Sequence, residues 1–251
     1  MKALRTWTIG AVVGLFSLAS LTAQHAPVRV IASNGVKTFV EALVPSYEKS
    51  SGRKAAVTYG TSSVLLKDIA GGAPFDLVIM TQEAMAELGK SGKLAGTPAV
   101  IGRARVGLGV PHGTRKPTAA TAADVKQALL AAKGIAYAGN GASRPTIEAM
   151  FAKLGVTDAV KGKTFLDVGS DGSIARVNKG DADLLLTLVS EIMPAPGIDL
   201  VGPLPAEFGG DVKFAGAVGA AAADAAAGKA LLGALLSRDA TATLRQKGLE
   251  R

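Results

Sequence analysis

The 251-residue sequence has no cysteine and only two histidines, His25 and His112. Without thiols the chain cannot form a disulfide, carry a lipid on a cysteine or bind a metal through thiolates. Aromatic residues make up only 4% of the chain, which leaves few surfaces on which nucleic-acid bases could stack. We therefore expect no metal site, no cofactor and no nucleic-acid partner.

Acidic residues are fewer than basic ones, since the chain has 20 Asp and Glu against 28 Lys and Arg, and its formal net charge is +8. No block of five or six like charges occurs, so the excess does not resemble a basic arm that binds nucleic acid. A spread positive charge can attract small anions over long range, or it can be a solvated surface without bearing on a ligand.

The N-terminus carries the layout of a secretory signal peptide. A short basic stretch is followed by an apolar run over residues 6–21 and by the small residues Thr22 and Ala23. The apolar run is shorter than the roughly 20 residues that a membrane span needs. We predict a signal peptide over residues 1–23, cleavage after Ala23 and a mature protein in the periplasm.

Strand-like and helix-like segments alternate along the rest of the chain. Short β-branched runs such as VRVIA at 28–32 are followed by a polar turn and by apolar residues at helical spacing, which is typical of an α/β fold. One open sheet of about ten strands would be near the upper limit, so we predict two lobes. The predicted fold has two doubly wound α/β domains joined by crossovers near residues 103–106 and 207–213. Lobe 1 comprises residues 24–104 plus 213–251, and lobe 2 comprises residues 105–212. The stretch 197–205 is predicted to be loop-rich.

Four predicted strand ends carry small polar residues directly before a helix. In open α/β sheets ligands bind at this edge, and the free N–H groups of a helix start attract an anion. Each turn by itself also fits an ordinary helix cap. Four such turns at one cleft would bind a single small anion. The candidate residues in these turns are Ser33, Asn34, Gly35, Thr61, Ser62, Ser63, Ala142, Ser143, Arg144 and Ser170.

Arg144 stands out because a cation in the first turn of a helix opposes the helix dipole. A bidentate grip on a ligand carboxylate would explain its position. A surface salt bridge to Glu148, four residues further along the helix, is the alternative.

Three stretches resemble the periplasmic molybdate-binding-like proteins, which are type II substrate-binding proteins of ABC importers. They are VRVIASNG at 28–35, YGTSSVLLKDIAGGAPFDLVI at 59–79 and NKGDADLLLTLVSEI at 178–192. The resemblance implies the type II periplasmic binding fold, hinge closure around a small anion and delivery of that anion to an ABC permease in the inner membrane.

The resemblance also assigns residues. It matches the family's binding serines to Ser33 and Ser62, its later donors to Ala142 or Ser143 and to a position near Ser170. The tyrosine that completes a molybdate cage falls at about Leu188, and Thr187 is the nearest polar substitute. Without that phenol, and with Arg144 nearby, we expect a small organic carboxylate rather than a molybdate-like oxyanion.

We accordingly predict a monomeric solute-binding protein of an ABC importer that is not an enzyme. A sensor that presents the bound anion to a receptor is a related possibility. The alternative from another class is a periplasmic dehydratase or lyase, in which Arg144 holds a small carboxylic acid and Asp171 transfers a proton.

Overall fold

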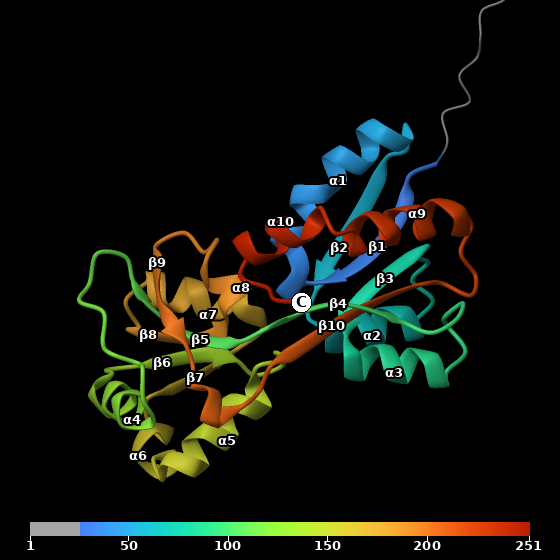
Figure 1. The fold of residues 1–251 in the computed structure, drawn as a ribbon. Coiled ribbons are helices and arrows are strands. Elements are labelled where there is room, and N and C mark those ends of the chain that lie inside the picture. The colour runs from blue at the N-terminus through green and yellow to red at the C-terminus, as the bar shows by residue number, and fades with distance from the viewer. Residues whose placement is uncertain (1–25) are drawn as a thin grey trace, which may run out of the picture.

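The computed structural model describes residues 26–251, so the predicted signal peptide lies outside the described residues. Two lobes lie side by side, and each is built around one five-stranded sheet (Figure 1). Within residues 26–251, no helix has the length and apolar character needed to cross a membrane. The two-lobed α/β architecture agrees with the predicted fold class.

The sheet of the first lobe has the strand order β2-β1-β3-β10-β4. β1 pairs in parallel with β2 and β3, whereas β10 runs antiparallel to both β3 and β4. Strand β10 returns to this sheet only after the second lobe has been completed. The strands are β1 (Val28–Ser33), β2 (Ala55–Gly60), β3 (Leu77–Thr81), β4 (Ala99–Ala104) and β10 (Val212–Val218).

The sheet of the second lobe repeats this plan with the order β7-β6-β8-β5-β9. β6 is parallel to β7 and β8, and β5 is antiparallel to β8 and β9. The strands are β5 (Val106–Pro111), β6 (Ile135–Ala138), β7 (Thr164–Asp167), β8 (Leu184–Leu188) and β9 (Ile198–Pro203). Our division into residues 24–104 plus 213–251 and residues 105–212 stays a prediction, and Val212 lies in β10.

Helices cover both faces of each sheet. In the first lobe α1, α9 and α10 pack on one face and α2 and α3 on the other; in the second lobe α4, α5 and α6 lie opposite α7 and α8 (Figure 1). In the first lobe the helices are α1 (Lys37–Ser51), α2 (Ser62–Ala70), α3 (Gln82–Lys90), α9 (Ala225–Leu236) and α10 (Ala240–Gln246). In the second they are α4 (Ala122–Ala131), α5 (Arg144–Leu154), α6 (Thr157–Lys161), α7 (Gly169–Asn178) and α8 (Val189–Ile192). Two 3-10 turns, η1 (Asn34–Val36) and η2 (Ala206–Phe208), complete the elements.

The buried strands are apolar on both sides because both sheet faces are covered. In β3, Leu77 and Ile79 pack with the α1 and α9 side, whereas Val78 and Met80 pack with the α2 and α3 side. Successive side chains of a strand point to opposite faces, so this run is apolar throughout.

Two strands differ from the sequence-based expectation. Residues 198–203 form β9 although we predicted a loop there, and β4 at residues 99–104 was not predicted. Both lie at an edge of their sheet, and the pairing of each with its neighbour contains a register shift. Edge strands have weak apolar alternation and tolerate glycine and proline, so partner strands rather than local sequence define them.

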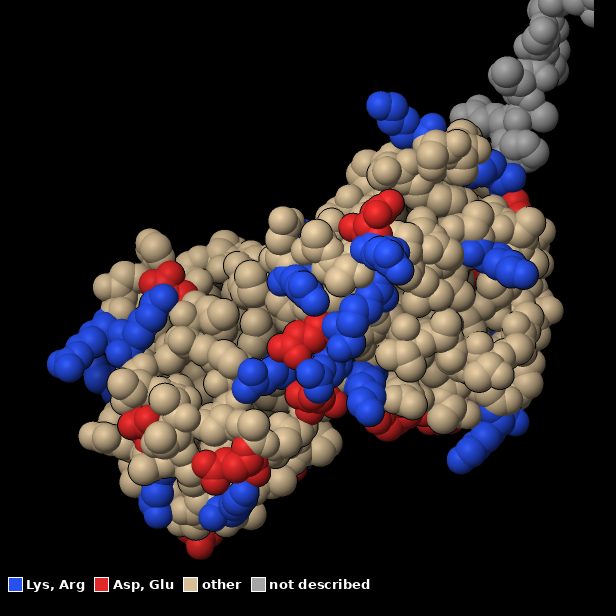
Figure 2. Space-filling view, viewed as in Figure 1, with Lys and Arg blue, Asp and Glu red and all other residues tan. Residues whose placement is uncertain are grey.

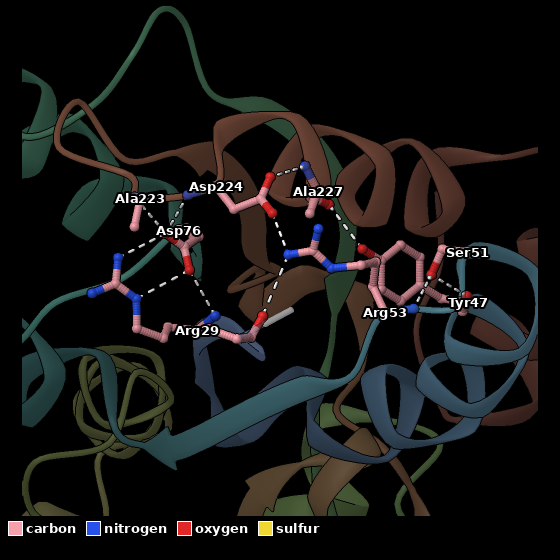
Figure 3. A network of polar contacts seen from close by, with 9 residues as sticks. Arg29, Tyr47, Ser51, Arg53, Asp76, Ala223, Asp224 and Ala227 are labelled. Atoms are coloured by element: carbon pink, nitrogen blue, oxygen red, sulfur yellow. Dashed lines mark hydrogen bonds and ion pairs between the residues drawn. The ribbon is translucent and has the colours of Figure 1, made fainter. Parts of the chain in front are cut away.

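Asp76 of the GAPFD stretch ties three segments of the first lobe together (Figure 3). Its carboxylate accepts bonds from Arg29 Nη2 at 2.7 Å, from Arg29 Nε at 3.0 Å and from the Arg29 amide at 2.8 Å. The amides of Ala223 and Asp224 donate to it at 2.8 and 3.2 Å. Asp224 in turn caps α9 and pairs with Arg53. The motif thus anchors β1, β3 and the C-terminal helices to one another.

Candidate functional site

A small cavity lies between the two lobes, at the ends of β1 and β8. Its volume is about 20 Å³, which is room for about one water-sized probe, so the lobes are closed on each other here. Residues from both sheets contribute. They are Ser33, Asn34, Gly35, Thr61, Ser62, Ala138, Gly141, Ala142, Ser170, Thr187, Leu188 and Glu191.

Ser33 and Gly35 form the wall on the first lobe after β1. Ser33 precedes η1, but its hydroxyl does not cap the turn, and the residue is almost fully buried. A Cβ on Gly35 would lie 2.4 Å from Phe214 Cζ and 2.9 Å from Leu188 Cδ1. Only glycine therefore allows the second lobe to approach so closely.

The start of α2 forms the neighbouring wall. Thr61 is the N-cap, and its hydroxyl accepts from the Val64 amide at 3.4 Å. The buried Ser62 hydroxyl accepts from the Thr81 amide at 3.2 Å, which fixes this turn to the end of β3. Thr61 thus has the capping role that we considered as an alternative, and it also lines the cavity.

The turn after β6 supplies the opposite wall and joins the lobes. Asn140 Nδ2 donates to Thr61 Oγ1 at 3.3 Å, and Ser63 Oγ donates to the Asn140 carbonyl at 3.1 Å. Asn140 Oδ1 also accepts from the Gly169 amide at 2.8 Å. On the other side of the cavity, Ser190 Oγ donates to the Gly35 carbonyl at 2.7 Å. These bonds close the cavity from two sides.

Glu191 is the one ionisable side chain among the lining residues, and the sequence did not point to it. Its carboxyl group accepts from Thr187 Oγ1, from Ser170 Oγ at 3.1 Å and from the Leu188 amide at 3.4 Å. Removal from water raises the pKa of Glu191 above its usual range, Asp171 adds to the rise, and the three hydrogen bonds oppose it. The raised pKa favours the protonated carboxyl, which can donate a hydrogen bond to an anion or exchange a proton with it.

Eight of the eleven predicted site residues line this cavity. Ser63 lies at the rim, where it bonds to Asn140, and Ser143 is buried at the start of α5 without a capping bond from its side chain. The structure adds Ala138, Gly141, Leu188 and Glu191 to the predicted set. Thr187 lines the cavity, but its hydroxyl is engaged by Glu191.

Arg144 does not line the cavity, which corrects our expectation that it grips a ligand carboxylate. Its Nε donates to Glu148 Oε1 at 2.8 Å and its Nη1 to the Gly139 carbonyl at 2.7 Å. The alternative, a salt bridge to the residue four positions along the helix, is therefore what the structure shows. Asp171, the proton donor of the predicted dehydratase or lyase, is exposed in the first turn of α7.

No metal centre is evident at this site. Within the described part of the chain, no three acidic or histidine side chains come together closely enough to hold a metal ion. The groups that face the cavity are hydroxyls, amides and one carboxyl.

Comparison with known families agrees with this geometry. A family model described as "Bacterial extracellular solute-binding protein" matches residues 28–250. The chain belongs to this family. Among solved structures, the periplasmic molybdate-binding protein of Azotobacter vinelandii is similar, with a TM-score of 0.77 and 15% identity over 89% of this chain and 99% of that one. The substrate-binding domain of a putative molybdenum ABC transporter from Clostridium difficile has a TM-score of 0.68 and 21% identity over 90% of this chain and 98% of that one. The predicted resemblance to molybdate-binding-like solute-binding proteins is confirmed.

One relative contradicts our prediction that this solute-binding protein is not an enzyme. A protein from Pseudomonas sp. named aconitate isomerase is 28% identical over 254 residues, which cover 98% of this chain and 96% of the relative. A solute-binding fold is thus no argument against catalysis, and the prediction was wrong to exclude it.

Proposed function

We propose that this solute-binding protein holds a small unsaturated polycarboxylate between its lobes and isomerises it by proton transfer through Glu191. The observation that carries the proposal is the placement of one carboxyl, that of Glu191, in a pocket otherwise lined by neutral groups; removal from water raises the pKa of this carboxyl. An ionised carboxylate would repel an anionic ligand, so a carboxyl group in a pocket that only binds an anion would weaken the binding. The aconitate isomerase relative supports the choice of substrate class.

The neutral donors would hold the carboxylates of the substrate. The first turns of α2 and α7 present backbone N–H groups besides those bonded to Thr61 and Asn140, and Ser33 and Ser62 add hydroxyls. Such fixed donors also stabilise negative charge that develops during a reaction, because they need no reorganisation.

Isomerisation of an aconitate-like acid needs one proton-transfer group. The Glu191 carboxylate removes a proton from the methylene carbon next to a carboxylate, and the electron pair of that C–H bond delocalises over the adjacent double bond. Both carbon–carbon bonds of the three-carbon unit then share double-bond character, and the conformation in which the former single bond is held sets the geometry of the new double bond. The proton then returns from Glu191 to the other end of the three-carbon unit, which leaves the substrate with its original atoms and charge. A group serves both steps best when its pKa lies near the working pH.

The size of the cavity requires the lobes to separate before such a ligand can enter. A volume of about 20 Å³ cannot hold a tricarboxylate. Opening would break the bonds of Asn140 to Thr61 and of Ser190 to Gly35, and reclosure would form a wider pocket around the ligand. Hinge movement of two lobes is a common way to do this.

The test is to incubate the mature protein, residues 24–251, with trans-aconitate in D₂O and to follow the cis isomer and deuterium incorporation by proton NMR. We expect turnover and exchange in the wild type and a loss of about 100-fold or more in Glu191→Gln. Glu148→Gln, another Glu on the second lobe, is the matched control and should keep wild-type turnover. Unchanged turnover in Glu191→Gln would refute the proton-transfer role.

A second candidate function follows from the family itself. The chain would then be the periplasmic, monomeric binding component of an ABC importer that delivers a carboxylate or a molybdate-like oxyanion to an inner-membrane permease. The similarity to molybdate-binding proteins favours it. Thermal stabilisation by molybdate or by di- and tricarboxylates without any turnover would support this candidate, because ligand binding to the native state raises the melting temperature.

A further inference from the structure

A second and much larger pocket lies at the junction of the lobes, near the C-terminal end of the chain. Its volume is about 590 Å³, within the range of ordinary ligand sites. It is lined by Arg105 of the first crossover, by Val189 of α8 and Met193 directly after it, and by Arg245 and Arg251 of the C-terminal segment. Figure 2 shows Lys and Arg side chains gathered over the junction of the lobes, with some Asp and Glu side chains among them.

The basic side chains of the pocket lack acidic partners. Arg105 Nη2 donates to the Leu204 carbonyl at 2.7 Å, and Arg251 Nη1 donates to the Ile101 carbonyl at 2.7 Å. Glu250 also lines the pocket, but Arg103 engages its carboxylate at 2.8 Å. Within residues 26–251, no carboxylate side chain pairs with Arg105, Arg245 or Arg251. Three guanidinium groups therefore line a pocket whose one acidic side chain, Glu250, is paired with Arg103.

The short helix α8 separates this pocket from the interlobe cavity. Val189 and Met193 face the basic pocket, whereas Glu191 lines the cavity and Ser190 bonds to Gly35 of the first lobe. Across the basic pocket, a Cβ on Gly248 would lie 2.9 Å from Met193 Sδ, so the C-terminal segment packs directly on α8. The pocket is thus walled by parts of both lobes in their closed arrangement.

We propose that this basic pocket binds a small polyanion with two or more negative charges, and that the bound anion holds the lobes closed. Guanidinium groups bind carboxylates and phosphates in bidentate geometry, and the anion would bridge the crossover and the C-terminal segment beside α8. A ligand that binds the closed form better than the open form shifts the population toward closure. The inference does not depend on the proposed isomerase activity.

The binding test uses inorganic phosphate and, separately, citrate as probes in isothermal titration calorimetry at constant ionic strength. Within residues 26–251 the Arg245 side chain forms no ion pair, so Arg245→Glu removes a ligand contact without breaking an internal salt bridge. Lys229→Glu, an exposed position on α9, makes the same charge change away from the pocket. We expect at least a fivefold loss of affinity for the probe in Arg245→Glu and none in Lys229→Glu. A probe that binds Arg245→Glu as tightly as the wild type, or that does not bind the wild type at millimolar concentration, overturns the site.

Closure is tested by small-angle X-ray scattering with and without the probe. The wild type and Lys229→Glu should become more compact in phosphate or citrate, and Arg245→Glu should not. Binding without a change in the radius of gyration would overturn the role in closure. A preference for phosphate or for citrate identifies which of the two chemistries the pocket recognises. Turnover in Glu191→Gln is a separate readout, so failure of one proposal does not imply failure of the other.

Discussion

Substitution of Asp76 by asparagine should destabilise the protein strongly although the shape of the side chain is preserved. Oδ2 accepts two N–H groups of Arg29, and Oδ1 accepts one N–H of Arg29 and the amides of Ala223 and Asp224. Both oxygens are therefore needed as acceptors. Whichever way an asparagine is oriented, its NH₂ group must face at least two other donors (Figure 3).

The magnitude follows from the burial of the carboxylate. The Asp76 side chain is 2% exposed although Arg29 is 34% exposed, and loss of this buried charge, with at least two N–H donors left facing an NH₂ group, costs about 3 kcal/mol or more. In a protein of this size 1 kcal/mol corresponds to about 2–4 °C, so the melting temperature should fall by about 6–12 °C at pH 7. Circular dichroism against temperature measures this change, with the exposed Asp68→Asn on α2 as the control.

The pH dependence gives an independent check. The Arg29 guanidinium and the backbone N–H donors hold the pKa of Asp76 well below its usual range. Its stabilising effect is therefore complete above the unfolded pKa of about 3.9 and is lost as the pH falls toward the folded pKa. The gap between the wild type and Asp76→Asn should stay constant from pH 7 to about 5 and narrow below about pH 4. A variant that melts within about 2 °C of the wild type at pH 7 would refute the reasoning.

Three further predictions concern the site. Gly35→Ala should lower the melting temperature and weaken ligand binding in the cleft about tenfold or more, because the added Cβ meets Phe214 and Leu188, and calorimetry checks both effects. Gly162→Ala, where the added Cβ meets nothing within 4 Å, should change neither quantity. Arg144→Ala should leave the affinity for a carboxylate ligand within about twofold, since the guanidinium pairs with Glu148 at the surface, and a tenfold loss by calorimetry would return Arg144 to the site. Ligand binding should take up protons, because a bound anion raises the already raised pKa of Glu191 further; affinity should fall as the pH rises through that pKa, and Glu191→Gln should abolish this slope in titrations at several pH values.

The sequence predicted the elements that local pattern determines and missed those that depend on partners. Strands such as β6 and β8 are short apolar runs bounded by turn residues, and they form where expected. The edge strands β4 and β9 depend on pairing with β10 and β5, which the local sequence does not encode. The same division applies to the site. The polar turns at strand ends were visible as sequence motifs. For Arg144 the sequence left two partners open, a ligand carboxylate and Glu148, and the structure shows the bond to Glu148.

Glu191 was missed for a related reason. Its position four residues after Thr187 is compatible with a local hydrogen bond, and such a Glu near a helix start usually has a structural role. Its significance arises from burial against Ser170 of α7 and from closure of the first lobe over it. Neither contact is near in sequence to Glu191, so no spacing rule could have revealed its raised pKa.

The placement of α8 explains how one fold could serve both binding and catalysis. Hydroxyls and backbone amides neither take up nor release protons near neutral pH, so a cavity lined by them alone can hold an anion but cannot move its protons. Glu191 adds that capacity, and the adjacent Ser190 bonds to Gly35, two residues from Ser33. Closure of the lobes would therefore bring the proposed anion-binding turn of the first lobe against the proposed proton-transfer group of the second in a single movement. Ligand capture and positioning of the reactive carbon would then be the same event, and an open conformation would be unable to catalyse the reaction.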